Sequence, residues 1–273
     1  MTRSIILDLI ESVGLSRHAD DIQGFVKNTI NWQPIPPKQG QVDVGRSKLG
    51  GLPDLPSSME WPVWKNQPLS FIGQFRMTEA APHDSDGALP HTGFLYFFYE
   101  ANEQVWGYDP AHRGAWRVLH YDGPDSELCR RLKPGIHSAG TVPEDEFQEC
   151  VLEFSQGVSL PTSESPLVMS LNFTAEESDD YCQLLEEVAE LNGDGPAYHH
   201  LLGHPETIQG DMQLECQLAS HGLYCGDSSG YEDSLRAHLE EGAKDWRLLL
   251  QVDSDDDVGM MWGDVGRIYY FPD

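Results

Sequence analysis

Residues 93–99 read GFLYFFY, an aromatic and aliphatic run of the length and texture of one buried strand. Residues 69–75 (LSFIGQF) have a similar apolar density, and the polar stretch 83–87 (HDSDG) lies between the two runs. Further strands are predicted outward from this pair at residues 116–121, 151–154, 246–253 and 266–271. Residues 211–220 alternate apolar and polar side chains, which also favours a strand.

Helices are predicted mainly outside these runs. Apolar residues between positions 5 and 13 share one helical face, and a short helix is expected around residues 20–29. Thr174 and Glu177 have the spacing of a capping box, so a helix should start there and end near Gly193. From Asn31 onward, repeated prolines predict irregular chain that runs over the surface or clamps against the sheet.

The two ends of the chain resemble each other. Residues 50–53 (GGLP) precede a strand that ends near Gln74 and then the aromatic strand 93–99. Residues 202–205 (LGHP) precede a strand that ends near Gln251 and then the aromatic strand 266–271. Two similar units predict a sheet of two pseudo-repeated halves around one core.

Charge is distributed unequally along the 273 residues. The whole chain has a net charge of −28, and residues 141–273 hold 29 acidic against four basic side chains, a net of −25. Such a surface repels nucleic acid phosphates and anionic membranes, so both are excluded as partners, and it attracts a basic protein or a cation. The alternative is that the acidity only serves solubility.

Cysteine usage and the N-terminus indicate the compartment. The five cysteines are an odd number without a C-x-x-C pair, which argues against a disulfide framework. The N-terminal run contains Asp8 and Glu11 and lacks the features of a secretory leader, and no apolar run is long enough to span a membrane. We therefore expect a cytoplasmic protein.

Several motifs resemble those of the YwqG-like family, bacterial domains without an established function. They are residues 47–56 (SKLGGLPDLP), 68–74 (PLSFIGQ), 201–205 (LLGHP), 222–227 (GLYCGD), 246–255 (WRLLLQVDSD) and 261–269 (MWGDVGRIY). The resemblance implies an α+β fold built on mostly antiparallel sheet with a few peripheral helices. We expect a helical segment at residues 1–30 and a single domain at 31–273. The resemblance implies no catalytic residues, and its relatives near toxin systems suggest an immunity-like role.

The most acidic loop lies between the last two predicted strands. Asp253, Asp255 and Asp257 match the first three ligand positions of an EF-hand calcium loop, and Asp264 matches the twelfth. Val258 stands where the turn of that loop needs glycine, so an EF-hand is not indicated. A looser calcium or magnesium site and a solvated hairpin loop both remain open.

A ligand pocket is the second candidate. Gln74 and Gln251 end equivalent strands, and together with Trp262 and Asp253 they could line one pocket. Alternatively, each glutamine satisfies backbone groups where its strand ends.

Three weaker constellations complete the candidates. His199, His200 and His204 lie close enough in sequence for a metal site, although Gly203 and Pro205 interrupt a helix there. Cys225 lies in a glycine-flanked turn and could be a nucleophile, with His221 or His238 as its base, but no catalytic spacing accompanies it. The glycine loop at residues 45–51 contains Lys48 but matches no phosphate-binding motif.

Three functions follow. The leading one is a non-catalytic protein that binds a basic protein partner through its acidic C-terminal half. The second is a divalent-cation-dependent enzyme or small-ligand-binding protein that uses the loop from Asp253 to Asp264. The third is a structural protein whose acidity serves solubility alone.

Overall fold

The structure, a computed structural model, describes residues 3–37, 40–135, 147–193 and 197–271. Within these residues, nine antiparallel strands form one sheet in the order β13-β12-β11-β1-β10-β2-β6-β7-β8. The strands of this sheet are β1 (Lys27–Ile35), β2 (Lys48–Leu49), β6 (Ser70–Arg76), β7 (Phe94–Tyr99), β8 (Trp116–Tyr121), β10 (Cys150–Ser159), β11 (His200–Leu201), β12 (Leu250–Asp253) and β13 (Arg267–Tyr270). Two small pairs lie beside it: β3 (Asp54–Pro56) with β9 (Leu128–Arg130), and β4 (Val63–Trp64) with β5 (Gln67–Pro68).

The sheet is built from two equivalent halves that meet at the β1–β10 pair. β10 pairs with β2, then β6 and β7 follow; β1 pairs with β11, then β12 and β13 follow. β1 precedes β2 in the chain but pairs with β11, and β10 precedes β11 but pairs with β2. The halves have therefore exchanged their first strands, and the predicted pseudo-repeat is confirmed.

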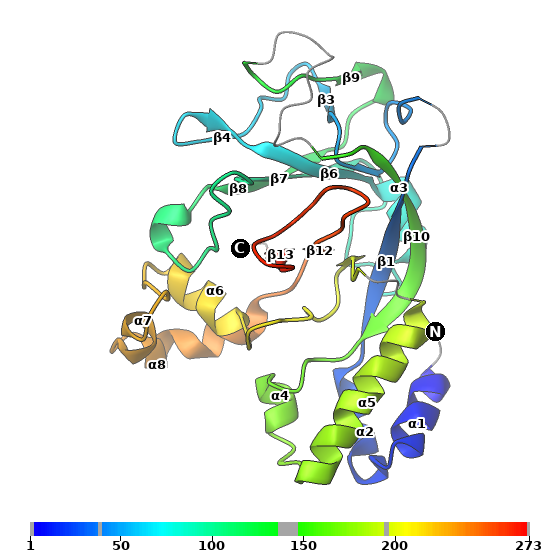
Figure 1. Cartoon of the computed structure of the whole chain (residues 1–273), viewed down its shortest axis with the longest axis vertical. Coiled ribbons are helices and arrows are strands. Elements are labelled where there is room, and N and C mark those ends of the chain that lie inside the picture. The colour runs from blue at the N-terminus through cyan, green and yellow to red at the C-terminus, as the bar shows by residue number, and fades with distance from the viewer. Residues whose placement is uncertain (1–2, 38–39, 136–146, 194–196, 272–273) are drawn as a thin grey trace.

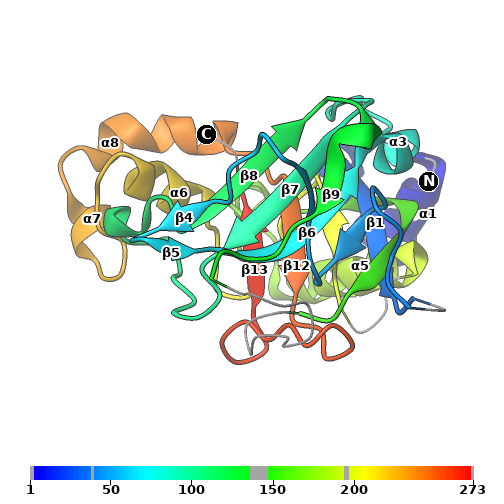
Figure 2. The same cartoon turned by 90° about the horizontal axis from the view of Figure 1, so that it is seen from above.

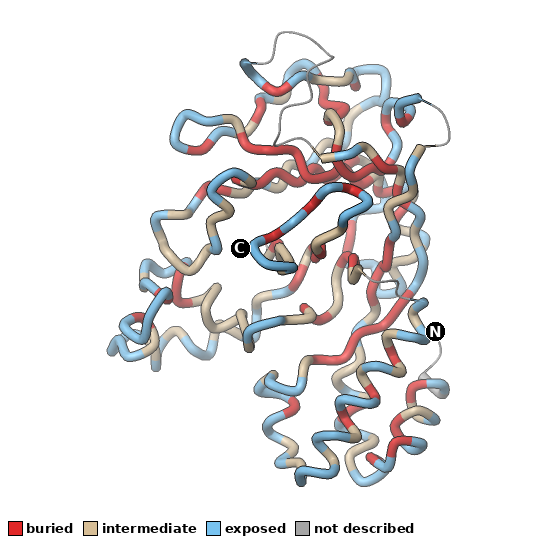
Figure 3. Tube along the Cα trace, viewed as in Figure 1, coloured by how far each residue is buried: buried red, intermediate tan, exposed pale blue. Residues whose placement is uncertain are grey.

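The sheet curls around one core, so that its two arms meet (Figure 1). The Tyr270 hydroxyl on β13 donates to the Phe98 carbonyl on β7 at 3.2 Å, and the rings of Phe97 and Tyr270 lie 5.0 Å apart. Both halves contribute to this core, for example through Ile72 and Leu250, which are fully buried. Buried residues follow the strands and exposed residues follow the loops and outer helix faces (Figure 3).

Helices cover two regions outside the sheet. The helices are α1 (Arg3–Ser12), α2 (Ala19–Phe25), α3 (Met77–Ala80), α4 (Pro166–Met169), α5 (Ala175–Asn192), α6 (Gln213–Ser220), α7 (Ser229–Glu232) and α8 (Arg236–Leu239). α1, α2, α4 and α5 share an apolar cluster with the end of β10. α6, α7 and α8 form a second group at the other end of the molecule (Figures 1 and 2). No helix among the described residues is long and apolar enough to cross a membrane.

Most predicted elements are present with shifted bounds, and the α+β class is confirmed. The capping box of α5 is formed by Thr174 and Glu177, and Gly193 ends the helix in the left-handed region with φ 71°. The strand predicted at residues 211–220 is wrong, because this segment is α6. Its Leu214 and Leu218 alternate with polar residues but also stand four apart, and as a helix both pack near Cys225.

The irregular segment expected from Asn31 is also wrong at its start. β1 continues through Pro34 in the middle of the sheet. The Trp32 amide donates to the carbonyl of His199, just before β11 begins. The backbone nitrogen of Pro34 faces the same side of β1, and β11 does not extend that far. The missing amide hydrogen of Pro34 therefore costs no ladder hydrogen bond.

Candidate functional site

The two predicted glutamines occupy equivalent places in the two halves. Gln74 accepts from the Asp54 amide at 2.8 Å and donates to the Arg46 carbonyl at 2.8 Å. Gln251 accepts from the Glu206 amide at 2.9 Å and donates to the Tyr198 carbonyl at 2.9 Å. Both side chains are fully buried, each in its own half.

The hydroxyls of two tyrosines extend this equivalence. Tyr96, opposite Gln74, donates to the Asp54 carbonyl at 2.8 Å. Tyr269, opposite Gln251, donates to the Glu206 carbonyl at 2.8 Å. Each half therefore holds the loop after its short strand with one glutamine and one tyrosine.

The first half surrounds a buried lysine with carboxylates. Lys48 has no exposed side-chain surface, and its Nζ lies 3.0 Å from Glu149 and 3.4 Å from Asp54. Arg130 also contacts Asp54, at 3.1 Å. Burial lowers the pKa of Lys48, whereas Asp54 and Glu149 act to raise it. The positive charge of Lys48 is therefore neutralised by protein carboxylates. The lysine in the glycine loop has a structural role that needs no bound phosphate.

The second half has a different ionic network. Arg267 lies 3.0 Å from Asp253 and 3.6 Å from Glu206. His199 Nδ1 accepts from the Asp253 amide at 3.1 Å, so its Nε2 carries the proton and donates to Asp255 at 3.2 Å. This hydrogen bond is the main cause of a lowered pKa at Asp255.

The predicted cation ligands are placed in different environments. Asp253 is buried against Arg267, and Asp255 is bound by His199 and by the Asp257 amide at 2.8 Å. Asp257 and Asp264 are exposed. Among the described residues, no three His, Cys, Asp or Glu side chains gather as a metal site requires. The cation site at this loop stays a prediction.

Trp262 fixes this loop to the core. Its indole is buried, contacts Tyr99 and Phe147 edge-on, and donates to the Asp253 carbonyl at 3.2 Å. The Trp262 amide donates to Ser254 Oγ at 3.0 Å. The loop that connects β12 to β13 is therefore held in one shape, with exposed segments at its tip (Figure 3).

A second loop, between β7 and β8, is joined to this one by a single amide side chain. Gln104 accepts from the Gly263 amide at 2.7 Å and donates to the Met261 carbonyl at 3.0 Å. Both loops project from the same side of the molecule (Figure 2).

Large apolar side chains are exposed on these two loops. Trp106 is 68% exposed, Val265 64% and Met261 43%. The charged residues exposed on the same loops are four acids, Glu103, Asp256, Asp257 and Asp264, and one base, Arg113. We call this region the loop surface, and it consists of Glu103, Trp106, Asp256, Asp257, Met261, Asp264 and Val265.

The sequence reasoning missed Trp106. Its only signal was a tryptophan in a polar loop between two predicted strands. Its neighbour Val105 packs inward while Trp106 points away.

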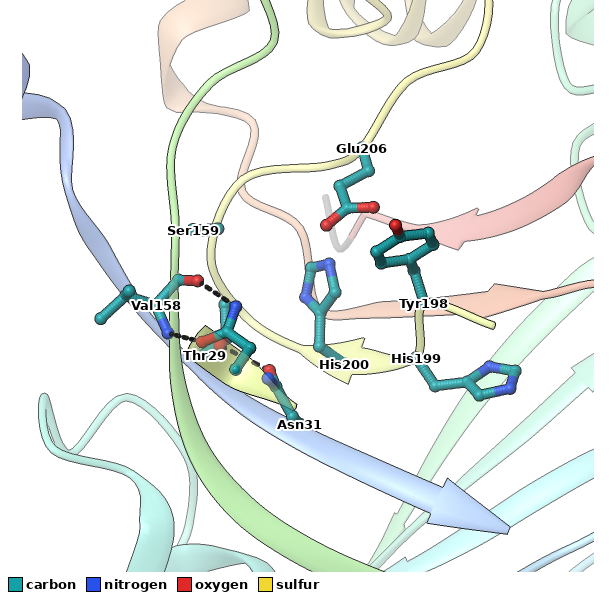
Figure 4. A pocket seen from close by; sticks show the side chains of 9 residues that line it. Thr29, Asn31, Val158, Ser159, Tyr198, His199, His200 and Glu206 are labelled. Atoms are coloured by element: carbon teal, nitrogen blue, oxygen red, sulfur yellow. Dashed lines mark hydrogen bonds between the residues drawn. The ribbon is translucent and has the colours of Figure 1, made fainter. Parts of the chain in front are cut away.

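A small polar pocket lies where β1, β10 and β11 run side by side (Figure 4). It is lined by Thr29, Asn31, Val158, Ser159, Asn192, Tyr198, His199, His200 and Glu206. It has room for about one water molecule. The three predicted histidines do not converge, since His199 binds Asp255 and His204 Nε2 donates to the Phe25 carbonyl at 2.7 Å.

Cys225 is a buried structural thiol. It contacts the Leu223 carbonyl at 3.6 Å and packs with α6. Burial raises the pKa of its thiol, so the nucleophilic thiolate is disfavoured.

Comparison with known proteins identifies the family. Residues 47–272 match the model of a family described as a domain of unknown function (DUF1963). A search of curated proteins finds no match. The matched range covers most of the chain, including β2, both glutamines and the whole acidic loop. The chain therefore belongs to the DUF1963 family.

Proposed function

We propose that the chain is a non-catalytic binding protein that holds a basic protein partner on its loop surface. The observation that supports this most is the 68% exposure of Trp106, on a loop that Gln104 joins to the loop with exposed Met261 and Val265. Exposed apolar groups that gather on one surface mark interaction sites, and tryptophan is enriched among residues that dominate binding energy.

Charge supports the same class of partner. Glu103, Asp256, Asp257 and Asp264 are exposed on the same two loops as the apolar side chains and give these loops a net negative charge. Complementary charge accelerates association with a basic partner and repels phosphate backbones and anionic lipid. Arginine suits this surface because its guanidinium can stack on an indole while it pairs with a carboxylate.

Finer assignments belong to the same proposal. The motifs at residues 47–56, 68–74 and 246–269 support a YwqG-like member of the family, and an immunity-like role against a basic toxin is one form of the function. The five free cysteines support a cytoplasmic location.

Binding of a defined peptide tests the proposal. The probe is a short peptide of arginine, lysine and leucine, and its control carries glutamate and serine in their places. We expect the basic peptide alone to bind, with an affinity that falls at least tenfold in Trp106→Ala and falls steeply between about 0.05 M and 0.5 M salt. Met169→Ala, which alters an exposed apolar side chain on α4, is the matched control and should bind normally.

Equal binding of both peptides, or equal affinity of wild type and Trp106→Ala, would remove the proposal. Because Trp106 is mostly exposed, the variant should unfold at the wild-type temperature, so a loss of binding is not a loss of folding.

The cation-dependent alternative has less support, since Asp253 and Asp255 already have protein partners. Calorimetric titration with calcium and magnesium tests it. If neither ion releases or absorbs heat on addition to the protein, the alternative is contradicted.

A further inference from the structure

The polar pocket of the second half lies where the first half holds the ammonium group of Lys48. In the strand pairs, Lys48 on β2 lies opposite Gln74 on β6, and His200 on β11 lies opposite Gln251 on β12. Lys48 and His200 therefore occupy corresponding positions. By the same register, Asp54 corresponds to Glu206, since each amide is bound by its glutamine.

The residue that corresponds to Glu149 can be found in the same way. Leu49 faces Cys150 in one half, and Leu201 faces Ile30 in the other. Glu149 therefore corresponds to Thr29. The Lys48 ammonium lies between Asp54 and Glu149, and the pocket lies among Glu206, Thr29 and His200.

His200 leaves a lone pair directed at this space. Its Nδ1 lies 2.8 Å from the Leu202 carbonyl, which can only accept, so Nδ1 carries the proton. Its Nε2 is buried and forms no hydrogen bond of ordinary geometry with the described residues, although the Gln251 side chain lies near the ring and acts to raise its pKa. The imidazole faces the Glu206 carboxylate and the Tyr198 ring across the pocket (Figure 4). Buried acceptors are matched by a protein donor, an ordered water or a bound ion in most structures, so this nitrogen marks a place for a small donor.

We propose that this pocket binds an ammonium ion, which takes the place of the Lys48 ammonium group in the other half. Ammonium is about the size of a water molecule, so it fits the space available. It donates hydrogen bonds to the His200 nitrogen and to the Glu206 carboxylate. Potassium and sodium ions have no hydrogen to donate and prefer oxygen ligands, so His200 favours ammonium over both.

The protonation state and local charges agree with a cationic ligand. Burial lowers the pKa of His200 to about 4, so the imidazole is neutral and its acceptor is available at neutral pH. Next to the pocket, Arg267 is shared between two carboxylates, Asp253 and Glu206. In the first half two cations, Lys48 and Arg130, meet Asp54 and Glu149.

Thermal unfolding of the full chain in different salts tests the site. Against potassium chloride at equal ionic strength, ammonium chloride should raise the Tm of the wild type by about 3 °C in a saturable manner. His200→Lys supplies its own ammonium group, so its Tm should no longer respond to ammonium. His221→Lys makes the same change at an exposed histidine and should keep the full response.

Equal Tm values in the two salts, or a full response in His200→Lys, would overturn the proposal and leave water as the occupant. If His200→Lys does not fold, the wild type still decides. ¹⁵N-ammonium should give a bound resonance in slow exchange with cross-peaks to the His200 ring, and its absence at high ammonium concentration contradicts the site. Neither result depends on the peptide experiment, since the pocket and the loop surface share no residue.

Discussion

Gln74 and Gln251 show how single side chains hold each half of this molecule. Each side-chain amide donates to a backbone carbonyl just before a short strand and accepts from a backbone amide after that strand. Because the side chains are fully buried, water cannot replace either bond. The side-chain amides of these two glutamines thus replace the backbone partners that the segments around each short strand would otherwise lack.

Replacement of either glutamine by leucine should destabilise the fold to a similar extent. Each change leaves two buried backbone groups without partners, which costs about 2–5 kcal/mol of unfolding free energy. Gln209→Leu, at an exposed position, should change it by less than about 0.5 kcal/mol. Urea denaturation measures all three, and a cost below about 1 kcal/mol for Gln74→Leu or Gln251→Leu would show that the loops are held by other contacts.

The sequence left two roles open for these glutamines: to line a ligand pocket, or to satisfy backbone groups where their strands end. Their position at the ends of echoing strands marked them as equivalent. Their hydrogen bonds reach Arg46 and Tyr198, many residues away, and a single sequence does not encode those distances. The ligand-binding role stays a prediction.

At the scale of elements, the capping box of α5 depends on one carboxylate. Glu177 accepts from the Thr174 amide at 2.9 Å and pairs with Arg17 from the N-terminal region. The Thr174 backbone hydrogen bond is the main cause that lowers the pKa of Glu177 to about 2, and Arg17 contributes next.

This shift predicts a pH dependence of stability. A carboxylate whose pKa is lower in the folded state stabilises the fold above the unfolded value, and that contribution disappears as pH falls from about 4.5 toward about 2. Glu177→Gln should therefore lose less stability than the wild type over this range, as measured by denaturation at each pH. The two should run in parallel above about pH 6, and parallel curves throughout would contradict the assignment.

Strands with strong local patterns were predictable, and those defined by distant partners were not. β7 and β8 follow from aromatic density alone, and their bounds nearly match the prediction. β2 and β11 contain only two residues each and exist because β1, β10, β6 and β12 pair with them. α6 was misread because its apolar residues satisfy both helical and strand spacing.

On the whole molecule, the acidic side chains divide among separate surfaces. Four exposed acids lie on α5, six lie in the segment from Asp227 to Asp245, and three lie on the β12–β13 loop. α5 and the group formed by α6, α7 and α8 are at different ends of the molecule (Figures 1 and 2). On the loop surface the acids lie on the same loops as exposed Trp106, Met261 and Val265, whereas the segment from Asp227 to Asp245 has exposed Leu235.

The loop surface could not be read from the sequence as a unit. Its two loops are joined by Gln104, whose partners Met261 and Gly263 lie in the last strand connection of the chain. The acidic loop was identified from its composition, whereas its apolar partner Trp106 was not. Exposure depends on where the curled sheet places each loop, and this is a property of the whole fold.

Mapping of the basic peptide on the isotope-labelled chain by NMR tests the central claim most directly. We predict chemical-shift changes at the Trp106 indole and at the amides of Gly263 and Val265, and unchanged signals along α5. Changes centred on the acids of α5, or spread over all three acidic surfaces, would contradict a binding site on the loop surface.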